Sequence, residues 1–311
     1  MHALDRLRLG GLARELRGAV VRGLRPSRAS RLRRYRREGG WPWTEGYAQH
    51  KQDLIVSALD SAALDAFGNG ETPAGWGLGV DERCVEIPWL FARLRALAGT
   101  DCDRPARILD AGSALNYEAF VARPPLAAAD LHIATLAPEP NCYWRRGISY
   151  LFADLRRLPV GDGWYDVVAS VSTLEHVGFS NRDYGVVAEH EAGEAAVAIA
   201  ELMRVLRPGG RLLVTVPFGL PHRFATQCVF DRDALDALSA AVGDAPRRVT
   251  FFRYDDAGWR GAHEAEAATA EFVPWIALPA AERRRTPPPR TADRAAAARA
   301  VACLEWRRPE R

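Results

Sequence analysis

The sequence of 311 residues lacks two features that would place it across a membrane or send it out of the cell. It has no apolar run of about 18 residues, which a membrane-spanning helix requires. Its first residues also lack the continuous apolar block of a signal peptide. Hydrophobic residues make up 48% of the chain, enough for a sizeable core. These properties indicate a soluble globular enzyme, which we expect in the cytoplasm.

Cysteine is scarce, and its spacing excludes two kinds of stabilised scaffold. The five cysteines are odd in number, lie far apart and include no C-x-x-C pair. They are Cys84, Cys102, Cys142, Cys228 and Cys303. A disulfide framework or a thiolate zinc site would need closely spaced pairs. We therefore expect a reducing compartment and no metal site.

Acidic residues are rare at the start of the chain. Residues 1–40 contain 12 arginines against three acidic residues, a net charge of +9 within a chain of net charge +3. Between residues 1 and 24, apolar side chains recur at helical spacing. An amphipathic helix here could let residues 1–37 contact an anionic membrane surface peripherally or dock a partner. It could equally be an ordinary capping helix or a loose tail.

Three regions follow one another along the chain. Residues 1–40 form the basic segment, and residues 41–98 are predicted to form a helical lid or cap. Residues 99–311 form the main domain, with a polar insertion near 256–298. The lid region contains an aromatic cluster, which suits either a packed cover or stacking on a ligand. The cluster comprises Trp41, Trp43, Tyr47, Trp76 and Trp89.

Short, apolar, β-rich segments alternate with helical segments in the main domain. They lie at residues 106–110, 131–136, 149–152, 165–170, 211–216, 247–254 and 300–306. Such alternation requires a parallel sheet that is covered by helices on both faces. We therefore predict an α/β fold built on a doubly wound, mostly parallel sheet.

The first β segment ends in a loop whose residues suit ligand binding. Asp110 and Gly112 stand at its carboxyl end, the edge at which open α/β sheets bind ligands. Glycine lets the backbone turn sharply and approach a ligand closely. A carboxylate can accept hydrogen bonds from a cationic amine or from the loop itself. Further along, Asp154 ends the third segment, and Asp166 opens the fourth as a structural residue.

These positions, taken in order with the segments that follow them, resemble a known family. The segments are Asp110-Ala111-Gly112, Asp154-Leu155, Ser172-Thr173-Leu174-Glu175-His176 and Pro208-Gly209-Gly210. The set resembles the class I S-adenosylmethionine-dependent methyltransferase superfamily, and Leu174-Glu175-His176 resembles its ubiquinone-biosynthesis-type branch. The resemblance covers roughly residues 106–217. It implies a Rossmann-like, seven-stranded sheet with an antiparallel terminal hairpin, and S-adenosyl-L-methionine as the cofactor.

The resemblance also implies a set of cofactor contacts. Asp110 and Gly112 would flank the methionine part, and Asp154 would accept a hydrogen bond from the adenine amino group. Thr135 occupies the place of the acid that usually binds the ribose hydroxyls. Ser172 and Thr173 would line the floor of the site beneath the sulfonium. The full set is Asp110, Gly112, Ser113, Thr135, Asp154, Leu155, Ser172 and Thr173.

Three positions depart from the family pattern. Ala114 and Asn116 stand where the family usually has glycines, and Thr135 replaces the acid, although Glu139 lies close enough in sequence to reach in. These departures keep open a catalytically silent member of the fold that binds a nucleoside-like ligand or a protein partner. A nicotinamide-dependent oxidoreductase would need a G-x-G-x-x-G turn, which residues 110–115 do not supply.

Methyl transfer from a sulfonium is an in-line displacement, for which a protein mainly aligns the reactants and excludes water. A hydroxyl acceptor also needs a base, for which His176 and His222 are the candidates and Glu175 a weaker one. A thiol, amine or carbanion acceptor can do without one. The main domain is net acidic and shows no ordered basic and aromatic interleaving, so no nucleic-acid substrate is expected. We predict a small-molecule or saccharide acceptor.

Overall fold

The computed structural model describes residues 26–97, 104–180, 193–243 and 248–310. The amphipathic helix predicted within residues 1–24 lies outside these ranges, so peripheral membrane contact stays a hypothesis drawn from charge. No helix in the described part of the chain is long and apolar enough to cross a bilayer.

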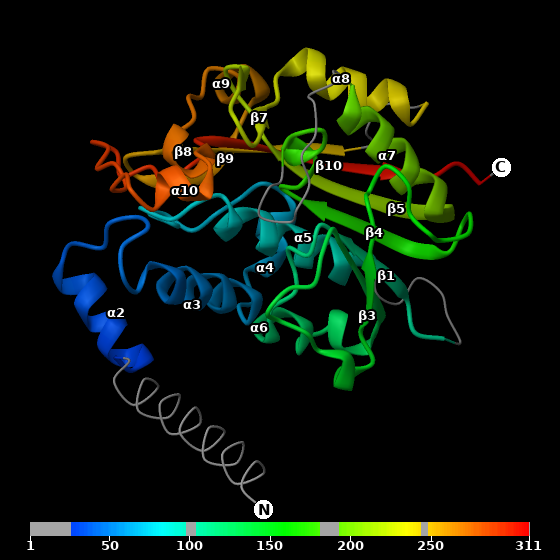
Figure 1. Cartoon of the computed structure of the whole chain (residues 1–311), viewed down its shortest axis with the longest axis horizontal. Coiled ribbons are helices and arrows are strands. Elements are labelled where there is room, and N and C mark those ends of the chain that lie inside the picture. Colours follow the sequence, from blue (N-terminus) through cyan, green and yellow to red (C-terminus); the bar gives the residue numbers. More distant parts are fainter. Residues whose placement is uncertain (1–25, 98–103, 181–192, 244–247, 311) are drawn as a thin grey trace, which may run out of the picture.

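An eight-stranded sheet runs through the middle of the molecule (Figure 1), in the order β3-β2-β1-β4-β5-β10-β8-β9. Its strands are β1 (Arg107–Ala111), β2 (Asp130–Thr135), β3 (Ser149–Phe152), β4 (Tyr165–Val171), β5 (Leu206–Pro217), β8 (Arg248–Asp255), β9 (Gly258–Ala262) and β10 (Ala300–Arg307). Strands β1 to β5 are parallel, whereas β10 is antiparallel to both β5 and β8. The predicted fold class is confirmed. Strand β9, inside the predicted polar insertion, adds an eighth strand to the seven expected.

Helices cover both faces of this sheet (Figure 1). One layer contains α3 (Tyr47–Leu59), α4 (Leu64–Gly68) and α5 (Arg83–Leu97), and the other contains α7 (Glu194–Val205) and α8 (Arg232–Ala241). The remaining elements are α2 (Arg28–Arg37), α6 (Glu118–Val121), η1 (Leu126–Ala128), η2 (Trp144–Arg146), η3 (Leu174–His176), β6 (His222–Arg223), β7 (Cys228–Val229), α9 (Glu264–Ala267), η5 (Pro274–Ala277) and α10 (Ala280–Arg283).

Alternating side chains of the strands divide the interior into two apolar cores. On β1, Ile108 belongs to the core beneath α5, and its neighbour Leu109 belongs to the core beneath α7. This follows from the strand geometry, because successive side chains point to opposite faces of the sheet. Leu202 of α7 is fully buried in the second core. The sheet is therefore packed on both faces.

Helix α5 is part of the core. Most of its residues are buried, and its apolar side chains share one cluster with residues of β4 and β10. The division of the chain at residue 98 stays a prediction about domains, but the end of the predicted lid forms one layer of the sheet structure. Because α5 lies against the sheet, its first turn can reach the carboxyl ends of the strands.

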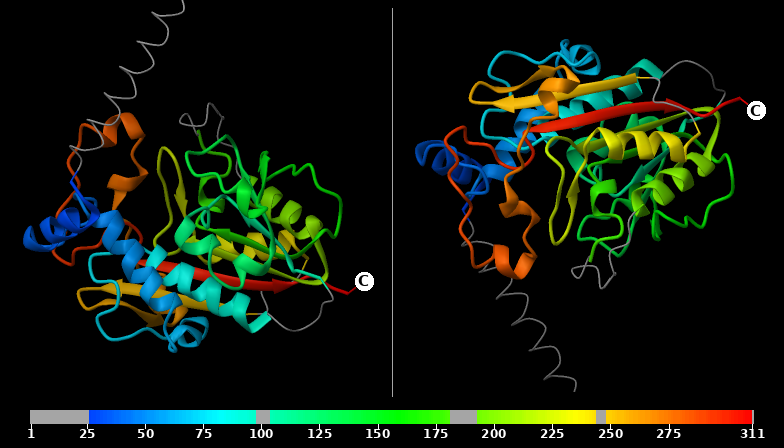
Figure 2. Two further views of the ribbon diagram at one scale, coloured as in Figure 1. Left: turned by 90° about the horizontal axis from the view of Figure 1, so that it is seen from below. Right: turned by 90° about the horizontal axis from the view of Figure 1, so that it is seen from above.

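Segments far apart in the sequence also meet at one end of the sheet. Figure 2 shows the region of α2 and α3 beside the region of η5 and α10. The Trp43 indole Nε1 donates to the Ala296 carbonyl at 2.9 Å, and the rings of Trp43 and Trp275 are 5.8 Å apart. Residues 41–47 and 272–296 thus form a common wall beside the sheet.

The packing of α7 gives a test of the second core. Replacing Leu202 by alanine removes a fully buried side chain, so the free energy of unfolding should fall by about 2–5 kcal/mol. The control is Val197→Ala on the same helix, where the side chain is 52% exposed and the change should stay within about 0.5 kcal/mol. Urea denaturation followed by circular dichroism measures both. Equal losses in the two variants would contradict the assigned orientation of α7.

Candidate functional site

Two neighbouring cavities lie at the carboxyl ends of the parallel strands. The smaller has a volume of about 360 Å³ and the larger of about 780 Å³. They share Arg83, Ser172 and His176 as wall residues. Both volumes fall in the range of small-molecule sites.

Six of the eight predicted cofactor residues line the smaller cavity. They are Gly112, Thr135, Asp154, Leu155, Ser172 and Thr173. They come from the ends of β1, β2, β3 and β4, which converge because parallel strands present their carboxyl ends at one edge. The structure therefore brings together residues that span about 60 positions of the sequence.

Gly112 cannot be replaced without disturbing the opposite wall. Its φ of +119° lies in a region that side chains other than glycine rarely adopt. A Cβ at this position would lie 2.1 Å from the hydroxyl oxygen of Thr173. The loop after β1 and the loop after β4 are thus in direct contact at the floor of the smaller cavity.

Asp110 and Ser113, the other two predicted contacts, lie beside the cavity and are not part of its wall. The fully buried Asp110 carboxylate accepts a hydrogen bond from the Leu115 backbone N–H at 2.8 Å, and burial raises its pKa to about 7. The Ser113 hydroxyl donates to Glu139 at 2.6 Å. In the described chain these two side chains hold the shape of the loop.

Glu139 brings a carboxylate to the end of β2, where the family usually has an acid and this chain has Thr135. Its Oε1 accepts from the Thr135 hydroxyl at 3.2 Å, and its Oε2 accepts from the Asn116 amide at 3.0 Å. Glu139 thus links two of the unusual positions, Asn116 and Thr135, with Ser113 into one network. Glu139 stands next to the smaller cavity and keeps Thr135 in its wall.

The Asp154 carboxylate lines the smaller cavity and is already paired with Arg156. Its carboxylate accepts hydrogen bonds from Arg156 Nε at 3.0 and 3.1 Å, and Arg156 also reaches Glu194. Hydrogen bonding to Arg156 lowers the pKa of the Asp154 carboxyl, so the group is ionised at neutral pH. An amino group that enters here would share this acceptor with Arg156.

The two candidate histidines have very different surroundings. His176 Nδ1 lies 2.8 Å from the Thr226 carbonyl, which can only accept, so Nδ1 carries the proton. Burial lowers the pKa of His176, which favours the neutral ring. His222 lies exposed on β6 with its ring against Phe224, and it lines neither cavity. The structure brings only His176 to the site.

A charged network at the start of α5 separates the two cavities. Arg83 pairs with Glu86 at 3.0 Å and donates to the carbonyls of Val171 and Ser172 at 2.9 and 3.3 Å. Glu86, fully buried, also accepts from the Ser172 hydroxyl at 2.6 Å. The helix layer is thereby tied to the end of β4.

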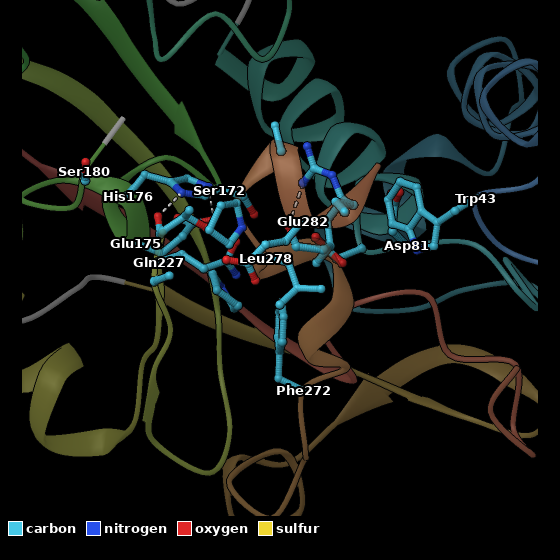
Figure 3. Close-up of a pocket in the computed structure, with 18 of the residues that line it drawn as sticks. Trp43, Asp81, Ser172, Glu175, His176, Ser180, Gln227, Phe272, Leu278 and Glu282 are labelled. Carbon is cyan, nitrogen blue, oxygen red and sulfur yellow. Dashed lines mark hydrogen bonds and ion pairs between the residues drawn. The ribbon is translucent and has the colours of Figure 1, made fainter. Parts of the chain in front are cut away.

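Carboxylates gather on the larger cavity's side of this network (Figure 3). Asp81 accepts from Lys51 at 2.6 Å and from the Tyr47 hydroxyl at 2.9 Å. Glu82 and Glu175 also line the cavity, and each has one oxygen without a hydrogen-bond partner among the described residues.

The first turn of α5 contributes to the site in a way that the sequence predictions did not include. The signal was present, because residues 81–86 place four charged side chains at the start of an otherwise apolar helix. Charges in a first helical turn usually serve as caps or face solvent, so they do not by themselves predict a site. A buried glutamate inside an apolar run, such as Glu86, is the stronger indication of a site.

Comparisons with known proteins agree with the geometry. Residues 112–214 match the protein family described as "Methyltransferase domain". The chain is 30% identical over 151 residues to a demethylmenaquinone methyltransferase of Mycolicibacterium vanbaalenii, a match that covers 48% of this chain and 57% of the relative. Residues 112–214 therefore resemble a methyltransferase domain, in agreement with the predicted class I S-adenosylmethionine-dependent family. The comparisons support the predicted family, and with it S-adenosylmethionine as the cofactor.

Solved structures of methyltransferases resemble the whole fold weakly. A 1,6-didemethyltoxoflavin-N1-methyltransferase of Burkholderia thailandensis, bound to S-adenosylhomocysteine, is 16% identical. The alignment covers 85% of this chain and 89% of that one, with a TM-score of 0.42. A putative sarcosine dimethylglycine methyltransferase of Galdieria sulphuraria is 15% identical, covering 71% and 84%, with a TM-score of 0.43.

Several carboxyl groups lie near the wall that the two cavities share. They predict an unusual pH dependence of the stability of the fold. Burial, with the Asp81 and Glu86 carboxylates nearby, raises the pKa of Glu82 to about 8. A raised pKa stabilises the fold below the unfolded-state pKa, and this contribution is lost as the pH rises toward the folded-state value. Glu82→Gln should therefore raise the thermal unfolding midpoint at about pH 8 and have a smaller effect at about pH 5.

The control for this variant is Glu71→Gln, at an exposed position. Differential scanning calorimetry at both pH values measures the two variants against the wild-type chain. The electrostatic interpretation of the site fails if Glu82→Gln lowers the midpoint at about pH 8, or if its effect is the same at both pH values.

Proposed function

We propose that the protein transfers a methyl group from S-adenosyl-L-methionine to a small-molecule or saccharide acceptor in the larger cavity. The observation that carries this proposal is the wall of Arg83, Ser172 and His176, which both cavities share. In-line displacement requires the two reactants to meet along one line, and two cavities with a common wall allow this.

The residues of the smaller cavity fit the cofactor. The Gly112 backbone is open to close approach, and Leu155 offers an apolar surface for an adenine ring. The Asp154 carboxylate can accept from the adenine amino group, and Thr135, supported by Glu139, can hydrogen bond a ribose hydroxyl. When bound, the cofactor supplies a methyl group on a positively charged sulfur, whose leaving group is a neutral thioether.

The chain's own contribution is to orient the reactants and exclude water. Ser172 is fixed by its donation to Glu86, so the shared wall is rigid on that side. His176 holds its proton on Nδ1 against Thr226, which leaves Nε2 as the ring atom with proton-accepting chemistry. With a hydroxyl acceptor, His176 would take the acceptor's proton at that atom.

Calorimetric titration tests the cofactor site. The wild-type chain should bind S-adenosylmethionine and S-adenosylhomocysteine, and bind NADH far more weakly. Asp154→Ala removes the adenine acceptor and should weaken both adenosyl ligands by about tenfold or more. The control is Asp162→Ala, whose exposed carboxylate pairs with Arg204 away from the cavity and should leave affinity unchanged.

Absence of adenosyl binding up to about millimolar concentrations would overturn the proposed function. Unchanged affinity in Asp154→Ala would show that adenine does not bind at this residue. Tight binding with no turnover on any of a panel of hydroxyl, amine and thiol acceptors would favour the catalytically silent alternative.

A pair of histidine variants tests the base. For a hydroxyl acceptor chosen from a panel of sugars and phenols, His176→Ala should retain affinity for S-adenosylhomocysteine and lose about 10²-fold or more in turnover. His222→Ala is the matched control and should keep nearly full turnover, because its side chain lies outside both cavities. Full turnover in His176→Ala would remove this residue as the base.

A further inference from the structure

Glu175 is a buried carboxylate that lacks a partner on one oxygen. It follows β4 directly, in η3, and is only 3% exposed. Its Oε2 has no hydrogen-bond partner among the described residues, and its Oε1 lies 3.9 Å from His176 Nε2. It lines the larger cavity, where Figure 3 shows it beside Ser172 and His176. Leaving a buried polar oxygen without a donor costs free energy, so this geometry suits a ligand that supplies one.

The basic side chains near Glu175 are already engaged. Arg83 pairs with Glu86 and also donates hydrogen bonds to the carbonyls of Val171 and Ser172. Lys51 pairs with Asp81 at 2.6 Å. This wall therefore carries more carboxylates than the cations on it can neutralise.

Glu82 is the second carboxylate with an unpartnered oxygen on this wall. The Arg83 guanidinium and the Glu82 and Glu86 carboxylates all act on Glu175, so these groups form one electrostatic cluster. A neutral hydroxyl would donate one hydrogen bond, to one of the two free oxygens, and would supply no charge. An ammonium group supplies three donors and one positive charge.

The rest of the larger cavity combines apolar side chains with a second group of charged residues. Its apolar lining consists chiefly of Trp43, Phe272, Ile276 and Leu278. Its other charged residues are Glu282, Arg283 and Arg284, from α10 and the residue after it, and Arg283 donates to the Ile276 carbonyl. An occupant can thus place an apolar body against these side chains while a polar group reaches the acidic wall.

We propose that the wall formed by Glu82 and Glu175 binds a cationic amine group of the acceptor, whose apolar body packs against Trp43, Phe272 and Leu278. The proposal rests on the methyl-transfer function above and names the class of compound that the larger cavity takes. Burial raises the pKa of both carboxyl groups, and a bound ammonium would favour their ionised form by charge pairing while it donates to Glu175 Oε2.

Three probes with the same phenethyl body test the charge preference: phenethylamine, 2-phenylethanol and 3-phenylpropionate. Their binding to the full chain is measured by ligand-observed NMR and calorimetry, with and without S-adenosylhomocysteine. Phenethylamine should bind at least about tenfold more tightly than either other probe, because a hydrogen bond to a charged group is worth about 1.5–3 kcal/mol.

Variants assign this preference to the acidic wall. Glu175→Gln and, separately, Glu82→Gln should weaken phenethylamine binding by about tenfold and leave 2-phenylethanol within about twofold. Two substitutions are used so that a folding defect in one does not decide the result. Glu282→Gln, which neutralises a carboxylate elsewhere in the same cavity, is the control and should keep the preference for the amine.

The proposal is overturned if the three probes bind equally, if the alcohol or the acid binds best, or if none binds up to about 10 mM. It is also overturned if the preference for the amine survives both glutamine substitutions. S-Adenosylhomocysteine binding in the same samples separates the two proposals. An amine preference without adenosyl binding would contradict methyl transfer and keep the amine site, whereas the reverse result would contradict the amine site alone.

Discussion

The contact between Arg83, Glu86 and Ser172 is the constraint on which the site depends. A half-buried guanidinium needs a carboxylate and additional acceptors to offset the loss of solvation, and here Glu86 and two carbonyls at the end of β4 provide them to Arg83. Glu86 in turn accepts from Ser172, whose φ of +37° is unusual for a residue with a side chain. The network thus fixes the backbone between the two cavities. Without it, neither cavity would have a defined common wall.

The parts of the site that were predictable from the sequence are those set by strand ends. Gly112, Thr135, Asp154 and Ser172 follow short apolar segments, and parallel strands bring such positions together whatever the intervening loops contain. Asp110 and Ser113 obey the same rule, but their side chains turn to Leu115 and Glu139, because a tight loop must satisfy its own backbone and polar groups first. Strand position specifies the edge of the sheet, and local hydrogen bonding decides which side chains reach the cavity.

The parts that were not predictable depend on contacts over long sequence separations. Prolines and arginines interrupt the apolar residues of 256–298 and predict a polar insertion, yet this segment supplies β9 and, with Phe272 and Leu278, a wall of the larger cavity. Helix α5 lies at the end of the predicted lid region, and its apolar side chains form a layer of the core. Neither result follows from periodicity, because periodicity reports which face of an element is buried but not against which partner.

The shared wall has a consequence for how two ligands would affect each other. Arg83, Ser172 and His176 belong to both cavities, so any displacement of these side chains by an occupant of one cavity alters the shape and charge of the other. Thermodynamic linkage makes this influence reciprocal: the factor by which the first ligand changes the affinity of the second equals the factor in the reverse direction. A single arginine at the start of a helix would therefore couple the affinities of the two cavities for their ligands.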